Sequence, residues 1–220
     1  MGNLCIIPAR GGSKRIAKKN IKEFLGKPII AYSIEIALKS KLFDEVMVST
    51  DDVEIAEISK EYGAHVPFMR SKKNADDFAT LSDVIKEVTR TYSDKFDYGC
   101  CILPTAPLLT IKNLHKAYEL LRSGFDSVRP VVEFSYPIQR ALKFDEEQRL
   151  VWVNEEYSKA RSQDMQPAFH DAGQFYWFNY NLGLVSSNRG AFVIDQMEVQ
   201  DIDSATDWAM AELKYGLMDK

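Results

Sequence analysis

Short apolar runs alternate with segments of helical period along the first 132 residues, and this alternation limits the chain to a small set of folds. The first run, Leu4 to Pro8, is continuously apolar, which is typical of a strand covered on both faces. The pattern predicts an α/β domain whose sheet is mostly parallel and covered by helices on both faces. Strands are expected at 4–8, 45–49, 98–103 and 127–132, and helices at about 28–38, 52–63, 84–88 and 110–124.

The alternation breaks after residue 133, where the sequence predicts an excursion from the sheet. Residues 134–175 contain an expected hairpin, with strands at 141–144 and 150–153 around a charged turn. Exposed hairpins of this kind are marginally stable alone and are often completed by a second subunit. The segment is therefore expected to protrude and to mediate dimerisation.

After the excursion the chain is expected to rejoin the same domain, so that residues 1–220 form one unit. The aromatic run from Phe175 to Phe178 is typical of a buried strand, and a final strand is expected at 197–202. Ser204 and Asp207 have the spacing of a capping box, which predicts a last helix from about residue 205.

Composition limits the partners and the location. The chain has 28 basic and 32 acidic residues and a net charge of −4, so neither a nucleic-acid partner nor a generally basic surface is expected. No apolar stretch reaches the roughly 20 residues that span a bilayer, and no basic segment leads into an apolar one near the N-terminus. Three sparse cysteines favour a reducing compartment. The expected protein has no membrane partner and is cytoplasmic.

The most informative segment follows the first strand. It reads Ile-Pro-Ala-Arg-Gly-Gly-Ser-Lys-Arg at 7–15 and places five basic residues within positions 10–19. It leaves the carboxyl end of that strand, where open α/β sheets bind ligands. Paired glycines allow the backbone to approach a ligand, and their N–H groups can bind an anion, which suits a triphosphate. The alternative is a solvated basic loop. The dinucleotide and Walker motifs are both absent from the sequence, so a dehydrogenase or a P-loop ATPase is not indicated.

Asp201 and Asp203 form a second candidate site. Two residues apart on an extended segment, their carboxylates are expected to share one face. Paired carboxylates repel each other unless a cation lies between them, so Mg²⁺ bridging to phosphate oxygens is the natural ligand. The alternative is a pair of solvated acids ahead of the last helix, where Asp207 serves as part of the cap.

The motifs resemble those of the acylneuraminate cytidylyltransferases, the family of the CMP-sialic acid synthetases. The segment at 7–15 with Lys19-Asn20 is the most specific match, and 162–164 with 170–177 most resemble the pseudaminic acid branch. The resemblance implies a Rossmann-like nucleotidyltransferase fold, a homodimer and a Mg²⁺-dependent reaction of CTP with a nine-carbon keto sugar acid. Weaker matches in the same order extend it over nearly the whole chain: Gly26-Lys27-Pro28, 48–52, Gly63-Ala64, 103–107 and 201–203.

The resemblance also implies the roles of individual residues. Arg10, Lys19 and Asp203 are expected to be catalytic, and Asp201 and Asp203 to bind the metal. Lys14 and Arg15 are either helpers or loop charges. The residues expected to bind the nucleotide are Ala9, Arg10, Gly11, Gly12, Ser13, Lys19, Asn20, Arg70, Thr80 and Ser82, where the two hydroxyls are alternatives for base recognition or helix capping. Those expected to bind the sugar acid are Leu103, Thr105, Arg161, Gln174 and Tyr176, with Arg161 reaching across a dimer interface.

Two departures from the sialic acid pattern favour pseudaminic acid as the substrate. Leu103 stands where sialic acid enzymes commonly carry glutamine, and Ala172 falls at the position of their asparagine. A buried polar group left unpaired costs roughly 1–3 kcal/mol, so both changes weaken recognition of N-acetylneuraminate. N-acetylneuraminate, legionaminate and 3-deoxy-octulosonate remain alternatives of the same chemistry. A sugar-1-phosphate nucleotidyltransferase and a non-catalytic nucleotide-binding module are alternatives of other kinds.

Overall fold

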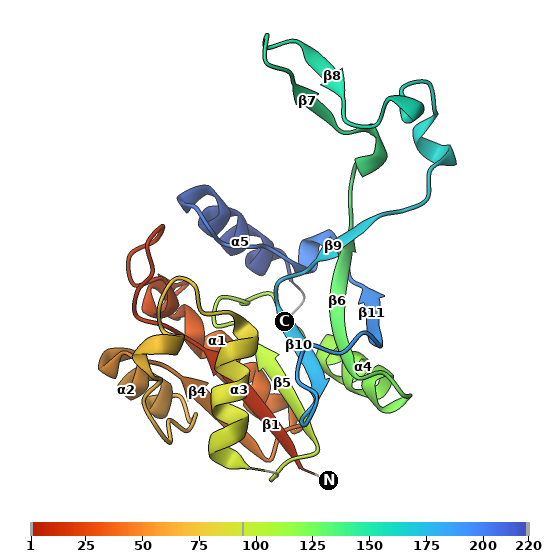
Figure 1. The fold of residues 1–220 in the computed structure, drawn as a ribbon. Helices are drawn as coiled ribbons and strands as arrows, with labels where there is room; N and C mark the ends of the chain where they lie inside the picture. The colour runs from red at the N-terminus through yellow and green to blue at the C-terminus, as the bar shows by residue number, and fades with distance from the viewer. Residues whose placement is uncertain (1, 94, 219–220) are drawn as a thin grey trace.

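The computed structural model describes residues 2–93 and 95–218, and a seven-stranded mixed sheet forms its centre (Figure 1). The strands are β1 (Asn3–Pro8), β4 (Glu45–Ser49), β5 (Tyr98–Ile102), β6 (Ser127–Glu133), β9 (Phe169–Asp171), β10 (Phe175–Asn179) and β11 (Arg189–Val193). Their order is β11-β6-β10-β5-β1-β4, and β9 pairs with β6. β1 is parallel to β4 and β5, β6 is parallel to β11, and β10 is antiparallel to both β5 and β6. Five of the seven strands therefore point the same way, which confirms the mostly parallel sheet.

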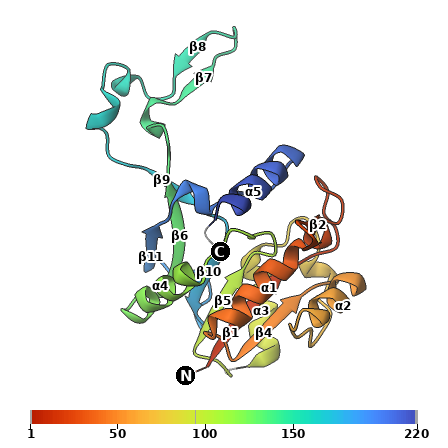
Figure 2. The same ribbon diagram turned by 180° about the vertical axis from the view of Figure 1, so that it is seen from behind.

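Helices cover both faces of the sheet, as predicted (Figures 1 and 2). They are α1 (Ile29–Ser40), α2 (Val53–Glu61), α3 (Leu81–Tyr92), α4 (Ile111–Arg122) and α5 (Ala205–Leu217). Alternate side chains of β1 point to opposite faces. Cys5 and Ile7 pack in one core with residues of α1 and α4, and Leu4 and Ile6 pack in a second core with residues of α3. All four are fully buried, which explains why this strand is continuously apolar from Leu4 to Pro8.

The shorter elements lie in the connections. There are two small hairpins, β2 (Glu23–Phe24) with β3 (Lys27–Pro28) and β7 (Leu142–Phe144) with β8 (Leu150–Trp152). The 3-10 turns are η1 (Lys19–Ile21), η2 (Lys72–Asn74), η3 (Ile138–Arg140), η4 (Glu155–Tyr157), η5 (Ser162–Asp164) and η6 (Gln196–Glu198). Within the two described stretches of chain, no helix is both long and apolar enough to cross a membrane.

The predicted hairpin is present and stands away from the sheet (Figure 1). The chain leaves the sheet after β6 and returns as β9, which pairs with β6, so the excursion ends earlier than the expected residue 175. Its apolar side chains are open to solvent: Phe144 is 67% exposed and Leu150 is 59% exposed. A two-stranded hairpin with exposed apolar side chains has no core of its own.

The strand predicted at 197–202 is wrong. Residues 196–198 belong to η6, and 199–203 lie in no helix or strand. Val199 and Ile202 are apolar because each is buried individually, at 8% and 1% exposure. The last strand is instead β11, at the edge of the sheet, where exposed and buried residues alternate. Its inward-facing residues are Gly190 and Phe192, and the outward-facing Ala191 and Val193 are apolar too, so its sequence lacks the polar–apolar alternation of an edge strand.

We expect Gly99→Ala to destabilise the centre of the sheet. Gly99 lies opposite Phe178 in the β5–β10 pair, and an added Cβ would overlap the fully buried Phe178 ring. Overpacking of this kind costs about 1–3 kcal/mol, which denaturant titration measures as a lower free energy of unfolding. Gly216→Ala is the matched control, because nothing lies within 4 Å of its added Cβ and alanine favours α5. Equal stability of the two variants would contradict the packing argument.

Candidate active site

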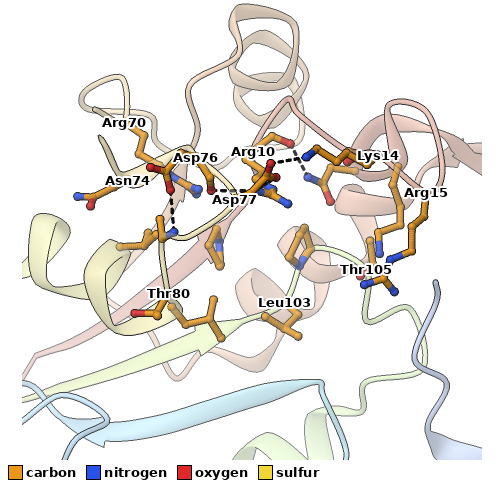
Figure 3. Close-up of a pocket in the computed structure, with 18 of the residues that line it drawn as sticks. Arg10, Lys14, Arg15, Arg70, Asn74, Asp76, Asp77, Thr80, Leu103 and Thr105 are labelled. Atoms are coloured by element: carbon orange, nitrogen blue, oxygen red, sulfur yellow. Dashed lines mark hydrogen bonds and ion pairs between the residues drawn. The ribbon is translucent and has the colours of Figure 1, made fainter. Parts of the chain in front are cut away.

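A cavity of about 510 Å³, called here the basic cavity, opens at the carboxyl ends of β1 and β5 (Figure 3). Its walls come from the loop after β1, the connection between η2 and α3, the loop after β5 and the segment leading into α5. Ligands of open α/β sheets bind at this edge. The residues singled out from the sequence that line it are Arg10, Ser13, Lys14, Arg15, Lys19, Asn20, Arg70, Thr80, Leu103, Thr105 and Asp203.

Two backbone contacts shape the loop after β1. Ala9 is fully buried, and its N–H donates to the carbonyl oxygen of Ser49 at 2.9 Å, which ties the start of the loop to β4. Asn20 is 6% exposed and donates from Nδ2 to the carbonyl oxygen of Arg10 at 2.9 Å. This bond joins the two ends of the loop, so Asn20 and Ala9 position the backbone of Arg10.

Gly11 and Gly12, which were expected to bind phosphate through their N–H groups, do not line the basic cavity. The N–H of Gly11 donates to Asp51 Oδ1 at 3.0 Å, and an added Cβ would overlap the side chain of Asp52, which caps α2. Gly11 is therefore needed for close contact with the start of α2, and its N–H already has an acceptor. Gly12 would place a Cβ in open space, and neither glycine lines the basic cavity. Positive charge in the cavity comes from side chains.

Four of the five basic residues of the loop line the basic cavity. Arg10 Nη1 donates to Asp77 Oδ1 at 3.1 Å, and Lys14 pairs with the other oxygen of Asp77 (Figure 3). The hydrogen bond from Lys14 is the main cause that lowers the pKa of Asp77, and Arg10 adds to it. The exception is Lys18, which is not among the lining residues and lies 2.5 Å from Glu54 Oε2. The interpretation as a solvated basic loop thus fits Lys18 alone.

The remaining two cations converge on Asp203. Arg15 Nη1 pairs with Asp203 Oδ2, and Lys19 Nζ lies 3.5 Å from Asp203 Oδ1. Lys19 also donates to the carbonyl oxygen of Ile202 at 2.6 Å, across 183 positions of sequence. The structure therefore brings Arg10, Lys19 and Asp203 to one cavity, as the sequence predicts.

Asp201 and Asp203 do not line the same cavity. Asp201 lines a second hollow, whose walls include Asp171, Ala172 and Lys214. The segment 201–203 thus contributes one carboxylate to each space. Among the described residues, no group of three or more His, Cys, Asp and Glu side chains could hold a metal ion. Of the predicted metal pair, Asp203 is the member that faces the cations of the basic cavity.

The capping box before α5 holds the backbone of Asp203, and its pH dependence can be tested. Asp207 Oδ2 accepts from the N–H groups of Asp203 at 3.1 Å and Ser204 at 2.8 Å, and the Ser204 hydroxyl is the main cause that lowers the pKa of Asp207. A carboxyl whose pKa is lower in the folded state adds stability above its unfolded pKa, and that stability is lost as the pH falls through the folded pKa.

We therefore expect Asp207→Asn to be less stable than the wild type at pH 7, and the difference to shrink as the pH falls below about 4, the ordinary pKa of an aspartate. Denaturant titrations of both proteins at pH 7 and pH 3 measure it. A difference of the same size at both pH values would argue against an ionised cap.

Arg70 and Thr80 form the side of the basic cavity nearest α3. Arg70 is 6% exposed; its Nε donates to Ser49 Oγ at 3.0 Å, and burial lowers the pKa of its guanidinium. Thr80 caps α3, and its hydroxyl donates to Asp83 Oδ2 at 2.6 Å. Of the two hydroxyls considered from the sequence, Thr80 lines the cavity and Ser82 does not.

The residues expected to bind the sugar acid fall into two groups. Leu103 and Thr105 line the basic cavity. Gln174 does not; it is 3% exposed and donates from Nε2 to the carbonyl oxygen of Glu198 at 2.5 Å. Its Oε1 is buried and accepts no hydrogen bond from any described group.

Tyr176 and Arg161 also lie outside the basic cavity. The Tyr176 hydroxyl donates to Asp171 Oδ1 at 3.1 Å, and Arg129 Nη1 donates to the other oxygen of Asp171 at 2.8 Å. Burial, followed by the charge of Asp171, raises the pKa of Tyr176. Asp171 lines the second hollow, so Tyr176 holds a residue of that wall by a hydrogen bond without lining the hollow itself. Arg161 lies on the excursion, where its Nε donates to Asp164 at 2.7 Å.

Three polar lining residues are missed by the sequence analysis: Asn74, Asp76 and Asp77. Asp77 meets Lys14 across 63 positions, so no local pattern connects them. The one available signal was a pair of adjacent carboxylates just before the Thr80 cap, in a chain whose ligand site is otherwise basic.

Comparison with known proteins agrees with the motifs. A family model described as Cytidylyltransferase matches residues 4–199. The chain is 43% identical to the pseudaminic acid cytidylyltransferase of Campylobacter jejuni, over 98% of this chain and 97% of that protein. It is 34% identical to N-acylneuraminate cytidylyltransferase A of Danio rerio, over 98% of this chain and 52% of that protein.

A solved structure has the same fold. CMP:2-keto-3-deoxy-manno-octonic acid synthetase complexed with CTP matches with a TM-score of 0.73 at 17% identity, covering 97% of this chain and 98% of that chain. The structural match supports the fold, and the sequence matches over nearly the full length confirm the resemblance drawn from the motifs. The chain belongs to the cytidylyltransferases, a family of nucleotidyltransferase enzymes.

Proposed function

We propose that the protein transfers CMP from CTP to pseudaminic acid and releases pyrophosphate. The observation that carries this proposal is the convergence of Arg10, Lys14, Arg15 and Lys19 with Asp203 around one cavity at the ends of parallel strands. Cations gathered in one cavity of an acidic chain suit a polyphosphate ligand. The 43% identity to two proteins named pseudaminic acid cytidylyltransferase supports the choice of sugar acid.

The reaction exchanges one phosphorus–oxygen bond for another. The anomeric hydroxyl of the sugar acid attacks the α-phosphorus of CTP, the bond from that phosphorus to the oxygen bridging to the β-phosphorus breaks, and the hydroxyl proton is lost to water. Negative charge grows on the α-phosphate oxygens and on the leaving pyrophosphate. Arg10 and Lys19 are held by backbone carbonyl oxygens at 2.8 Å and 2.6 Å, so they stabilise this charge with little rearrangement.

Mg²⁺ is proposed as the cofactor, with Asp203 as its protein ligand in the basic cavity. Mg²⁺ is commonly held by one or two carboxylates together with substrate phosphates, not by a complete set of protein ligands. A single carboxylate facing the cavity cations fits that mode, as does the lack of a three-ligand cluster among the described residues. Asp201 is kept as the second candidate ligand. When bound, the ion neutralises phosphate charge.

The basic cavity and the second hollow lie on either side of the segment 201–203. The sugar acid is proposed to bind between these two spaces. Leu103 and Thr105 face it from the first space, and Tyr176 is linked to the second through Asp171. Gln174 stays a candidate because its buried Oε1 has no donor among the described groups. Ala172 lines the second hollow and is 2% exposed, which leaves no amide where sialic acid enzymes have one.

We also propose a homodimer built through the β7–β8 excursion. The exposed Phe144 and Leu150 on a hairpin without its own core support this, and Arg161 on the same excursion would then reach the sugar acid of the other subunit. Size-exclusion chromatography with light scattering should give twice the chain mass of 25.1 kDa for the wild type and a smaller mass for Phe144→Asp. A monomeric wild type would contradict the dimer.

The function is tested by release of pyrophosphate from CTP with a panel of acceptors: pseudaminic acid, N-acetylneuraminate, a legionaminate, 3-deoxy-octulosonate and a sugar 1-phosphate. We expect the highest kcat/KM with pseudaminic acid. Turnover with the sugar 1-phosphate alone would replace the proposed reaction, and tight CTP binding without any turnover would favour a non-catalytic module. A cytoplasmic location is proposed as well, supported by the free, buried thiols of Cys5, Cys100 and Cys101.

A further inference from the structure

The basic cavity contains a carboxylate that the proposed reaction does not use. Asp77 lies between η2 and α3, and each of its oxygens pairs with a different cation of the loop after β1 (Figure 3). Oδ1 accepts from Arg10 Nη1 at 3.1 Å, and Oδ2 accepts from Lys14. The same Arg10 nitrogen donates to the carbonyl oxygen of Asp76 at 2.8 Å. One carboxylate therefore pairs with two cations that the proposed reaction assigns to phosphate.

The turn that carries Asp77 is shaped by its own hydrogen bonds. Asp76 Oδ1 accepts from the N–H groups of Phe78 and Ala79 at 2.9 Å and 2.8 Å, and the capping box at Thr80 follows directly. Phe78 is 91% exposed and does not bury the turn in the core. The Asp77 side chain can therefore rotate away from its cations while the turn and α3 stay folded.

These ion pairs are open enough to be exchanged. The side chains of Arg10, Lys14 and Asp77 are 37%, 73% and 43% exposed. Exposed ion pairs are individually weak because water and salt screen them. A phosphate group offers more acceptor oxygens and more charge than one carboxylate, so it can take over both cations.

We propose that Asp77 competes with phosphate for Arg10 and Lys14 and so lowers the affinity of the basic cavity for phosphate groups. It weakens the binding of every ligand whose phosphates use these two cations, CTP and pyrophosphate alike, and leaves the recognition of cytidine unchanged. Its effect is opposite to that of Asp203, which is proposed to bind the metal ion and so to favour phosphate binding. The competition also speeds the departure of pyrophosphate after transfer. This inference rests on the proposed function, because it concerns phosphate binding in the same cavity.

The test compares wild type with Asp77→Asn, which keeps the shape of the side chain and removes its charge. Isothermal titration in EDTA measures binding of CTP and inorganic pyrophosphate, and competition measures cytidine. We expect roughly three- to tenfold lower Kd values for CTP and pyrophosphate, the size of two exposed ion pairs, and an unchanged Kd for cytidine. The gain should shrink as salt is raised, and Asp77→Glu should restore wild-type affinity. Unchanged or weaker pyrophosphate binding by Asp77→Asn would overturn the proposal.

Glu54→Gln is the matched control. Like Asp77→Asn, it removes one carboxylate that pairs with a lysine of the loop after β1, so the change in net charge is identical. Neither Glu54 nor its partner Lys18 lines the basic cavity. We expect no change in its phosphate affinities; an equal gain would mean that net charge alone explains the result and would overturn the proposal. Thermal unfolding shows whether each variant is folded, and Asp77→Ala is a second substitution expected to bind pyrophosphate at least as tightly as Asp77→Asn.

Two further titrations distinguish competition by Asp77 from metal binding and from the transfer reaction itself. Titration with Mg²⁺ present tests whether Asp77 is itself a metal ligand, since loss of Mg²⁺-dependent CTP binding in Asp77→Asn would overturn the competitor role. The pyrophosphate titration requires no turnover. If no sugar acid in the panel is a substrate, the proposed function fails, while tighter pyrophosphate binding by Asp77→Asn still supports competition by Asp77.

Discussion

Arg10→Ala is expected to lower kcat/KM for CTP by about 10²- to 10³-fold, the loss typical when one prepositioned donor to a developing negative charge is removed. The Arg10 side chain reaches the cavity from a backbone fixed by Asn20 and donates to the carbonyl oxygen of Asp76 at 2.8 Å. It is part of no hydrophobic core cluster, so the fold should be unaffected. Steady-state pyrophosphate release gives the kinetic loss, and thermal unfolding followed by circular dichroism checks the fold.

Two variants control this result. Arg10→Lys keeps the charge and loses the planar fork, so an intermediate rate is expected. Lys18→Gln removes a cation of the same loop that pairs with Glu54 and lies outside the basic cavity, so its kcat/KM should stay within a few-fold of the wild type. Near wild-type turnover of Arg10→Ala would show that the basic cavity is not where the phosphates bind.

The second large effect is expected for Asp203→Asn. Removing a proposed metal ligand should lower turnover by about 100-fold or more and raise the Mg²⁺ concentration needed for half-maximal rate. The backbone N–H of Asp203 still donates to Asp207, so the capping box before α5 should persist. Initial rates measured over a range of Mg²⁺ concentrations separate weaker metal binding from a purely lower kcat.

Asp201→Asn measured in the same way decides whether the metal has one protein ligand or two. Glu57→Gln, an exposed carboxylate on α2, controls for the change in net charge and should leave both rate and Mg²⁺ dependence unchanged. If Asp203→Asn keeps wild-type turnover and Mg²⁺ dependence, Asp203 serves only as the ion-pair partner of Arg15 and Lys19.

The elements that could be predicted from the sequence are those whose residues carry a complete local signal. β1 is apolar from Leu4 to Pro8 because both of its faces are buried, and α5 begins at a capping box that is visible as Ser204 and Asp207. β11 was not predicted because its sequence does not alternate: Ala191 and Val193 are apolar but face outward, and Gly190 faces inward. Conversely, Val199 and Ile202 lie in a short segment that was expected to be a strand, but they are buried one at a time, without strand partners.

The same distinction applies to the site. The basic loop could be recognised because its charges lie close together in sequence, and Arg10, Lys14, Arg15 and Lys19 all line one cavity. The partner of two of them, Asp77, could not, because it is brought in by folding from a different connection. The function of Gly11 was also hidden, since the contact that requires a glycine is with Asp52.

The reversed strand β10 has a consequence for the order in which the molecule can assemble. β5 and β6 follow each other in the chain, yet β10 lies between them, and its residue Phe178 pairs with Gly99 and Ser127. During synthesis on the ribosome, the edges of β5 and β6 that later pair with β10 therefore stay unpaired until the whole excursion and β10 have been synthesised. Closing the sheet requires pairing between distant parts of the chain, which is slow. Until it is complete, those open edges are the parts of the nascent chain most exposed to wrong partners.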